Sequence, residues 1–142
     1  MATNLIPDEE YRKIVELVPI LTVDVILMYG DQFLLVQRAQ EPLKGSWWIV
    51  GGRAQKGEST LQAAKRKVIE ELGIGAKDFK LVGLYEDHYR KSSWGVPTSS
   101  VSVVYSATIE TTETTPDKTI TAVKLFDELP KRLTRKLILC QG

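Results

Sequence analysis

The residues best suited to chemistry are three acids in the stretch 51–74, where Glu58 leads into a helix-forming run that ends with the adjacent pair Glu70 and Glu71. Two neighbouring acids near the C-terminal end of a helix oppose its macrodipole, which is a local cost without an obvious structural benefit. Hard divalent cations prefer carboxylate and carbonyl oxygens. These glutamates, with the carbonyls of the two glycines that open the stretch, therefore predict a magnesium site. A solvated amphipathic helix with ordinary ion pairs is the alternative.

The spacing of the apolar residues predicts how this helix is held. At about 100° per residue, four apolar positions fall within one narrow stripe that faces a core: Leu61, Ala64, Val68 and Leu72. Arg66 and Lys67 lie away from that stripe, each four residues before an acid, so ion pairs along the helix are expected. Gly73 lies where a helix end usually takes a left-handed residue. We therefore expect one face of the helix to pack on the core and the charged residues to lie on another.

The spacing of this stretch resembles the Nudix box, the signature of the Nudix hydrolases, which is far more specific than a lone glycine motif. The matching positions are Gly52, five residues, Glu58, seven residues, Arg66, and then Val68, Glu70, Glu71, Gly73 and Ile74. The resemblance implies an α/β protein, an α/β/α sandwich with a mixed β-sheet, whose loop-helix-loop binds magnesium or manganese. It also implies hydrolysis of a nucleoside diphosphate linked to another moiety.

One position departs from the family pattern. Lys67 stands where the family normally has a glutamate, and that glutamate is commonly a metal ligand in members that attack phosphorus. Outside the box, the segment FLLVQRAQEPLKGSWWIVGGRAQKGES and the EDHY at Glu86–Tyr89 are similar to the GDP-mannose mannosyl hydrolase branch, which also lacks that glutamate. This similarity implies displacement at the anomeric carbon of a nucleotide sugar, with cations stabilising the departing GDP.

The resemblance also implies a metal site. It puts the ion, Mg²⁺ or alternatively Mn²⁺, on the Gly51 carbonyl and on Glu71, and the donor chemistry adds Glu58 and Glu70 as further metal-binding candidates.

The sequence leaves open which residue is the general base. The branch usually carries a histidine and a metal-binding glutamine in the loop before the last strand, but Thr112–Thr121 contains neither residue. In one interpretation Glu70 or Asp117 is the catalytic base for water. In the other, Glu70 binds a second metal and the enzyme attacks phosphorus.

Five residues are candidates for substrate contacts. By resemblance, Arg38, Arg53 and His88 surround the diphosphate as catalytic and substrate-binding residues. Arginine offers forked donors to phosphate oxygens, and histidine can donate a hydrogen bond or a charge. Tyr89 and Trp94 are the favoured stacking partners for the base, because their loop is polar and flexible.

Three functions therefore stay open. The first is a magnesium-dependent glycosyl hydrolase that releases GDP and mannose, or a related hexose, from a nucleotide sugar. The second is a Nudix pyrophosphohydrolase that yields a nucleoside monophosphate and a sugar phosphate. The third is a non-catalytic nucleotide-binding module, which Lys67 and the missing loop histidine favour.

The composition indicates a single domain, 1–142, because 142 residues with 43% hydrophobic and 26% charged content can bury one core. The net charge of +1 gives no bias toward nucleic acid. No stretch approaches a membrane span or a secretory segment, and the single Cys140 cannot form an internal disulfide, so a cytoplasmic location is expected. The resemblance implies a homodimer, in which the apolar first helix could cover a neighbour.

The elements that must position these residues follow from hydrophobic patterns and turn residues. Helices are expected at Pro7–Leu17 and Leu129–Leu139 on either side of the central one. A hairpin turn is expected at Gly30-Asp31, and Asp24 is expected to face outward. The predicted strands are Pro19–Tyr29, Gln32–Arg38, Trp47–Val50, Lys80–Tyr89, Ser99–Glu110 and Ile120–Phe126. Such a pattern suits a mixed sheet sandwiched by helices.

Overall fold

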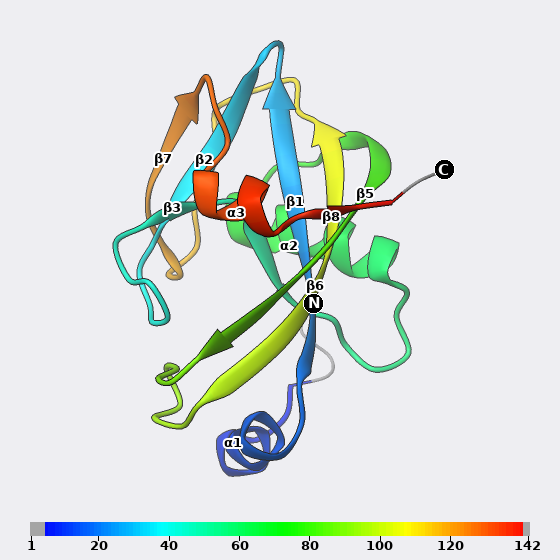
Figure 1. Ribbon diagram of the computed structural model, residues 1–142. Coiled ribbons are helices and arrows are strands. Elements are labelled where there is room, and N and C mark those ends of the chain that lie inside the picture. Colours follow the sequence, from blue (N-terminus) through cyan, green and yellow to red (C-terminus); the bar gives the residue numbers. More distant parts are fainter. Residues whose placement is uncertain (1–4, 141–142) are drawn as a thin grey trace.

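A mixed sheet of eight strands forms the centre of the computed structural model, which describes residues 5–140 (Figure 1). The central strand β1 pairs in parallel with β6 and antiparallel with β2 and β4, which confirms both the mixed sheet and the first hairpin. The outer strands are β3 and β7 beside β2, and β5 and β8 beyond β6. The strands are β1 (Ile20–Tyr29), β2 (Gln32–Arg38), β3 (Trp47–Trp48), β4 (Val50–Arg53), β5 (Lys77–Tyr89), β6 (Thr98–Thr108), β7 (Ile120–Phe126) and β8 (Ile138–Leu139).

Residues 5–140 also form three helices: α1 (Asp8–Leu17), α2 (Thr60–Leu72) and α3 (Lys131–Lys136). Helix α2 lies behind the sheet and α3 in front of it in Figure 1, which gives the expected α/β/α sandwich. Two cores result, one under α2 and one around Leu133 of α3, and a third cluster joins α1 to the start of β1. Within the described part of the chain, no helix combines the length and the hydropathy needed to cross a membrane.

Helix α2 begins and ends at residues with a clear capping role. Ser59 forms a capping box with Gln62, in which each side chain bonds the other residue's main-chain N–H. Gly73 adopts φ 69° and donates its N–H to the carbonyl of Ile69, which confirms the predicted helix end. The predicted apolar stripe is wrong at one position: Leu61 is 36% exposed, and Ala63 is buried instead. The buried face is rotated because Glu71 also belongs to it, through a hydrogen bond to the sheet.

Two expected elements differ from the structure. The predicted strand 47–50 is split at Ile49, because β3 pairs with β2 whereas β4 pairs with β1. The predicted C-terminal helix ends at Lys136, and the chain then forms β8 against Gly83 and Leu84 of β5. Glycine is required at this crossing, since a Cβ at Gly83 would lie 1.9 Å from the carbonyl oxygen of Ile138.

Candidate active site

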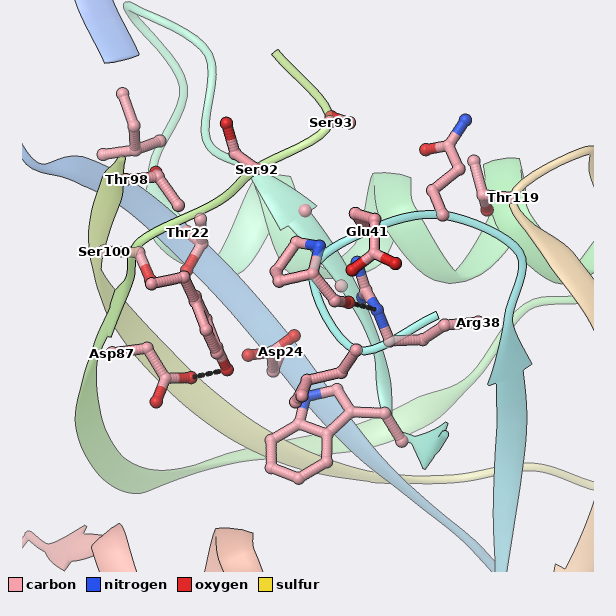
Figure 2. Close-up of a pocket in the computed structure, with 18 of the residues that line it drawn as sticks. Thr22, Asp24, Arg38, Glu41, Asp87, Ser92, Ser93, Thr98, Ser100 and Thr119 are labelled. Carbon is pink, nitrogen blue, oxygen red and sulfur yellow. Dashed lines mark hydrogen bonds between the residues drawn. The ribbon is translucent and has the colours of Figure 1, made fainter. Parts of the chain in front are cut away.

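A cavity of about 370 Å³ lies where the three hydrophobic clusters meet. Its volume falls in the range of about 300–1,000 Å³ that is typical of small-molecule sites. We name two walls by their helices. The α2 wall consists of Gly51, Gly52, Lys67 and Glu71, and the α3 wall consists of Trp48, Asp87, Tyr89 and Arg132. Figure 2 shows Asp24 on the strand between them, with Asp87 to one side and Arg38 to the other.

Glu71 is the best-placed acid of the α2 wall. Its side chain is almost fully buried, with 6% of the residue exposed. Oε1 accepts a hydrogen bond of 2.9 Å from the main-chain N–H of Gly51, and the hydroxyl of Thr119 lies 3.2 Å from Oε2. Burial raises the pKa of Glu71, and the nearby charge of Lys67 opposes that rise. Each carboxylate oxygen keeps acceptor capacity beyond its single bond, so the group can still bind a cation.

The other two acids of the box lie outside the cavity, because Arg66 holds both of them. Its guanidinium donates to Glu58 at 2.7 and 3.1 Å and to Glu70 at 3.1 and 3.2 Å. The hydrogen bonds from Arg66 hold the pKa of Glu58 below its usual value. Burial pushes the pKa of Glu70 up, but Lys67 and Arg66 together outweigh it and the pKa is lowered. Glu70 and Asp117 instead line a second hollow, which Lys67 also lines.

The residues at this wall could hold a divalent ion through a single carboxylate. Within residues 5–140, no three acidic, histidine or cysteine side chains converge as a metal cluster. Magnesium, however, is often held by one or two carboxylates together with substrate phosphates and water. Glu71, beside the main chain of Gly51, supplies oxygen donors of that kind at the cavity wall.

The three residues expected around a diphosphate lie in three different hollows of the surface. Arg38 lines the cavity and is oriented by a 2.7 Å hydrogen bond from Nε to the carbonyl of Pro42 (Figure 2). Arg53 lies in the second hollow, with its guanidinium 5.3 Å from the centre of the Tyr11 ring. His88 is exposed in a separate groove beside the end of α1. Successive side chains of a strand point to opposite faces, so His88 points away from the cavity that its neighbour Asp87 lines.

Both aromatic residues favoured for stacking line the cavity. Trp94 meets the ring of Tyr11 edge-on, with 5.0 Å between ring centres. Tyr89 donates its hydroxyl to Asp87 over 2.9 Å. The structure thus brings Arg38, Tyr89 and Trp94 to the same cavity as the proposed metal ligands Gly51 and Glu71.

The α3 wall contains charged residues that were not expected from the sequence. Asp87 is buried and accepts hydrogen bonds from Arg132 at 3.1 and 3.2 Å and from Lys136 at 2.5 Å. Burial alone would raise the pKa of Asp87, but these bonds and charges keep it lowered. The guanidinium of Arg132 stacks 4.2 Å above the ring of Trp48. Arg132 and Lys136 are 45 and 49 residues from Asp87 in the sequence, so their pairing could not be predicted from local spacing. The one available signal was the alternation along β5, which puts Asp87 and Tyr89 on the same face of the strand.

The floor residue Asp24 corrects another expectation, because it is buried rather than outward-facing. One of its oxygens accepts hydrogen bonds from the hydroxyls of Tyr85 and Ser102. Burial is the main cause that raises the pKa of Asp24 to about 7. Its two neighbours along the strand, Val23 and Val25, are fully buried as well. This strand is covered on both faces, so alternation does not expose every second residue.

The family model of the NUDIX domain matches residues 18–135. This match covers most of the chain, so the protein belongs to the Nudix family. Nudix hydrolases generally use divalent metal ions such as Mg²⁺ or Mn²⁺, which agrees with the oxygen donors at Glu71.

Individual relatives carry different names. The chain is 36% identical over 90 residues to the low-salt glycan biosynthesis protein Agl8 of Haloferax volcanii, covering 63% of this chain and 58% of that protein. It is also 36% identical over 70 residues to the human 8-oxo-dGDP phosphatase NUDT18, covering 49% of this chain and 21% of that protein. The chain therefore spans less than two thirds of the length of each of these relatives. The structure resembles a MutT NUDIX hydrolase from Burkholderia pseudomallei with a TM-score of 0.68 and 25% identity, covering 80% of this chain and 88% of that one.

Proposed function

We propose that this protein is a divalent-metal-dependent hydrolase of a nucleotide sugar, with GDP-mannose or a related GDP-hexose as substrate. Water attacks the anomeric carbon, the bond from that carbon to the diphosphate oxygen breaks, and GDP and free sugar leave with release of one proton. The observation that carries the proposal is that Glu71 alone, among the three box glutamates, lines the cavity. A single ion suits carbon attack, in which stabilising the leaving group matters more than activating phosphorus.

The divalent ion, Mg²⁺ or Mn²⁺, would be held by Glu71 and the main chain at Gly51, and it supplies positive charge for the departing diphosphate. Arg38 binds the diphosphate from the side of the cavity opposite Asp87, with Nε fixed by Pro42 so that its other donors remain for phosphate oxygens. Tyr89 and Trp94 provide aromatic surface for the base. In this scheme Arg53, Glu58, Glu70 and His88 have no contact with the reacting atoms.

The names of two relatives favour different reactions, one at the sugar carbon and one at phosphorus. The name of the Haloferax protein, which refers to glycan biosynthesis, suits a substrate that contains a sugar. The name of the human relative, a phosphatase of 8-oxo-dGDP, favours attack at phosphorus instead. Cleavage at phosphorus to give a nucleoside monophosphate is therefore the second candidate.

The position of attack can be measured directly. We would incubate the protein with GDP-mannose and Mg²⁺ in ¹⁸O-labelled water, separate the products by chromatography and locate the label by mass spectrometry. Carbon attack predicts GDP without label and mannose with label. GMP, or label in a phosphate, contradicts carbon attack and supports the second candidate. Binding without turnover across GDP-mannose, UDP-glucose and ADP-ribose supports a non-catalytic module.

A further inference from the structure

Lys67 places a positive charge in the α2 wall at the position where the box usually has an acid. Its Nζ lies 3.3 Å from Oε2 of Glu70. A Cβ built on Gly52 would come within 2.6 Å of Cε and 3.0 Å of Nζ of this lysine. The end of the lysine side chain therefore rests against glycine main chain, in space that any other residue at position 52 would fill. The ammonium group is held in place rather than free in solvent.

The same ammonium group faces two compartments. Lys67 lines the cavity together with Glu71, and it lines the second hollow together with Glu70. Its charge acts on both carboxylates: it helps to lower the pKa of Glu70, and it opposes the rise that burial causes in the pKa of Glu71. One cation between two neighbouring acids is the arrangement that a bridging divalent ion would otherwise provide.

We propose that the ammonium group of Lys67 is a built-in cation that binds the diphosphate of the nucleotide directly and takes the place of a second divalent ion between Glu70 and Glu71. This inference rests on the proposed function, because it takes the cavity as the site for a nucleoside diphosphate. An ammonium group has three donors, and Glu70 engages one of them. The others are available to phosphate oxygens, so the diphosphate binds even without metal, and the box binds a single divalent ion.

Calorimetry with GDP in the presence of EDTA tests the first consequence. The wild-type protein is expected to bind GDP without metal, and Lys67→Met is expected to bind at least about tenfold more weakly, as for loss of a hydrogen bond to a charged group. Lys65→Met is the matched control, because Lys65 is exposed on the same helix and its charge lies 5.8 Å from the ring centre of Phe79. This control should bind GDP as the wild type does. Equal binding by wild type and Lys67→Met, or no metal-free binding by the wild type, overturns the proposal.

Counting bound Mn²⁺ by electron paramagnetic resonance tests the second consequence. The wild type is expected to bind one ion per chain and Lys67→Glu two, with thermal unfolding used to show that the variant is folded. Two ions on the wild type, or one on folded Lys67→Glu, overturns the proposal. Failure of the wild type to bind GDP even with Mn²⁺ would instead remove the proposed function. Binding of GDP with Mn²⁺ that does not depend on Lys67 would remove this inference alone.

Discussion

Two charged clusters near the cavity each combine one acid, one arginine and one lysine, but they do so in different ways. In the α2 cluster, Glu70 pairs with Arg66 and Lys67, four and three residues earlier on one helix. In the α3 cluster, Asp87 of β5 pairs with Arg132 of α3 and with Lys136, the last residue of that helix. The side chain of Glu70 is 29% exposed, whereas that of Asp87 is 5% exposed.

The α2 cluster therefore joins residues of one helix, whereas the α3 cluster joins a helix to a strand of the sheet. The α2 cluster forms within a helix that would exist without it, because capping and an apolar face already hold α2. The α3 cluster joins a helix of six residues to the sheet, and so short a helix is not stable without tertiary packing. We therefore expect the α2 cluster to arrange charge for binding and the α3 cluster to maintain structure.

The largest effect is expected at Glu71, which lies beside the α2 cluster and is bonded to the main-chain N–H of Gly51 and the hydroxyl of Thr119. Glu71→Gln keeps the shape of the side chain but loses the negative charge that would hold the divalent ion. If the proposed function holds, turnover of GDP-mannose should fall about 100- to 1,000-fold, since bound metal contributes several kcal/mol to the stability of the transition state. Steady-state kinetics measures this loss, and thermal unfolding in EDTA should show an intact fold. Retained activity in the variant would contradict the metal assignment.

The next effect concerns Asp24, which lies between the two walls and belongs to neither cluster. Its pKa is about 7 in the folded protein, against an ordinary value of 3.8 for an aspartate. Between about pH 4 and pH 7 the unfolded chain releases this proton while the folded protein keeps it, so the Asp24 contribution to stability falls as pH rises. Asp24→Asn cannot titrate, and its amide oxygen can still accept from Tyr85 and Ser102. Its free energy of unfolding relative to wild type should therefore rise by roughly 3 kcal/mol from pH 5 to pH 8.

Urea unfolding in EDTA at both pH values measures this change. Wild-type and variant stabilities that run parallel with pH would show that Asp24 does not hold its proton.

A medium effect is expected for Asp87→Asn, which tests the structural role of the α3 cluster. The variant leaves the charges of Arg132 and Lys136 without their buried carboxylate partner, so the free energy of unfolding should fall by about 2 kcal/mol. Urea unfolding at pH 7.5 measures the loss. A stability equal to that of the wild type would remove the distinction between the two clusters.

The smallest effect is expected for the matched change Glu70→Gln in the α2 cluster. Its pairs are local and partly exposed, so the free energy of unfolding should change by less than about 1 kcal/mol. The same urea experiment serves for both variants. A larger loss here than in Asp87→Asn would reverse the assignment of binding and structural roles.

The sequence predicted whatever depends on local spacing. Helix α2, its end at Gly73 and the first hairpin are confirmed, because periodicity and turn residues determine them within a short window. The mixed sheet is confirmed as well, but its parallel pairing of β1 with β6 joins distant segments and followed from the overall order of elements. The cavity position of Glu71 also agrees with the box.

Three features could not be predicted, since they depend on residues distant in the sequence. Asp24 is buried because β1 is covered on both faces, and its hydrogen-bond partners Tyr85 and Ser102 are 61 and 78 residues away. The Asp87 pairs have the same nonlocal character. The distribution of Glu58, Glu70 and Glu71 over different surroundings depends on the rotation of α2 against β4, which the spacing alone does not give.

The crossing of β8 over Gly83 connects the far edge of the sheet to the α3 wall of the cavity. The strand that accepts β8 also carries Asp87, and the segment that forms β8 directly follows the helix that carries Arg132. Helix α3 is therefore attached to β5 twice, through the pair of Arg132 with Asp87 and through the pairing of β8. A side chain introduced at Gly83 would therefore displace β8 and, through α3, shift Arg132, so the shape of the cavity depends on a residue that does not line it.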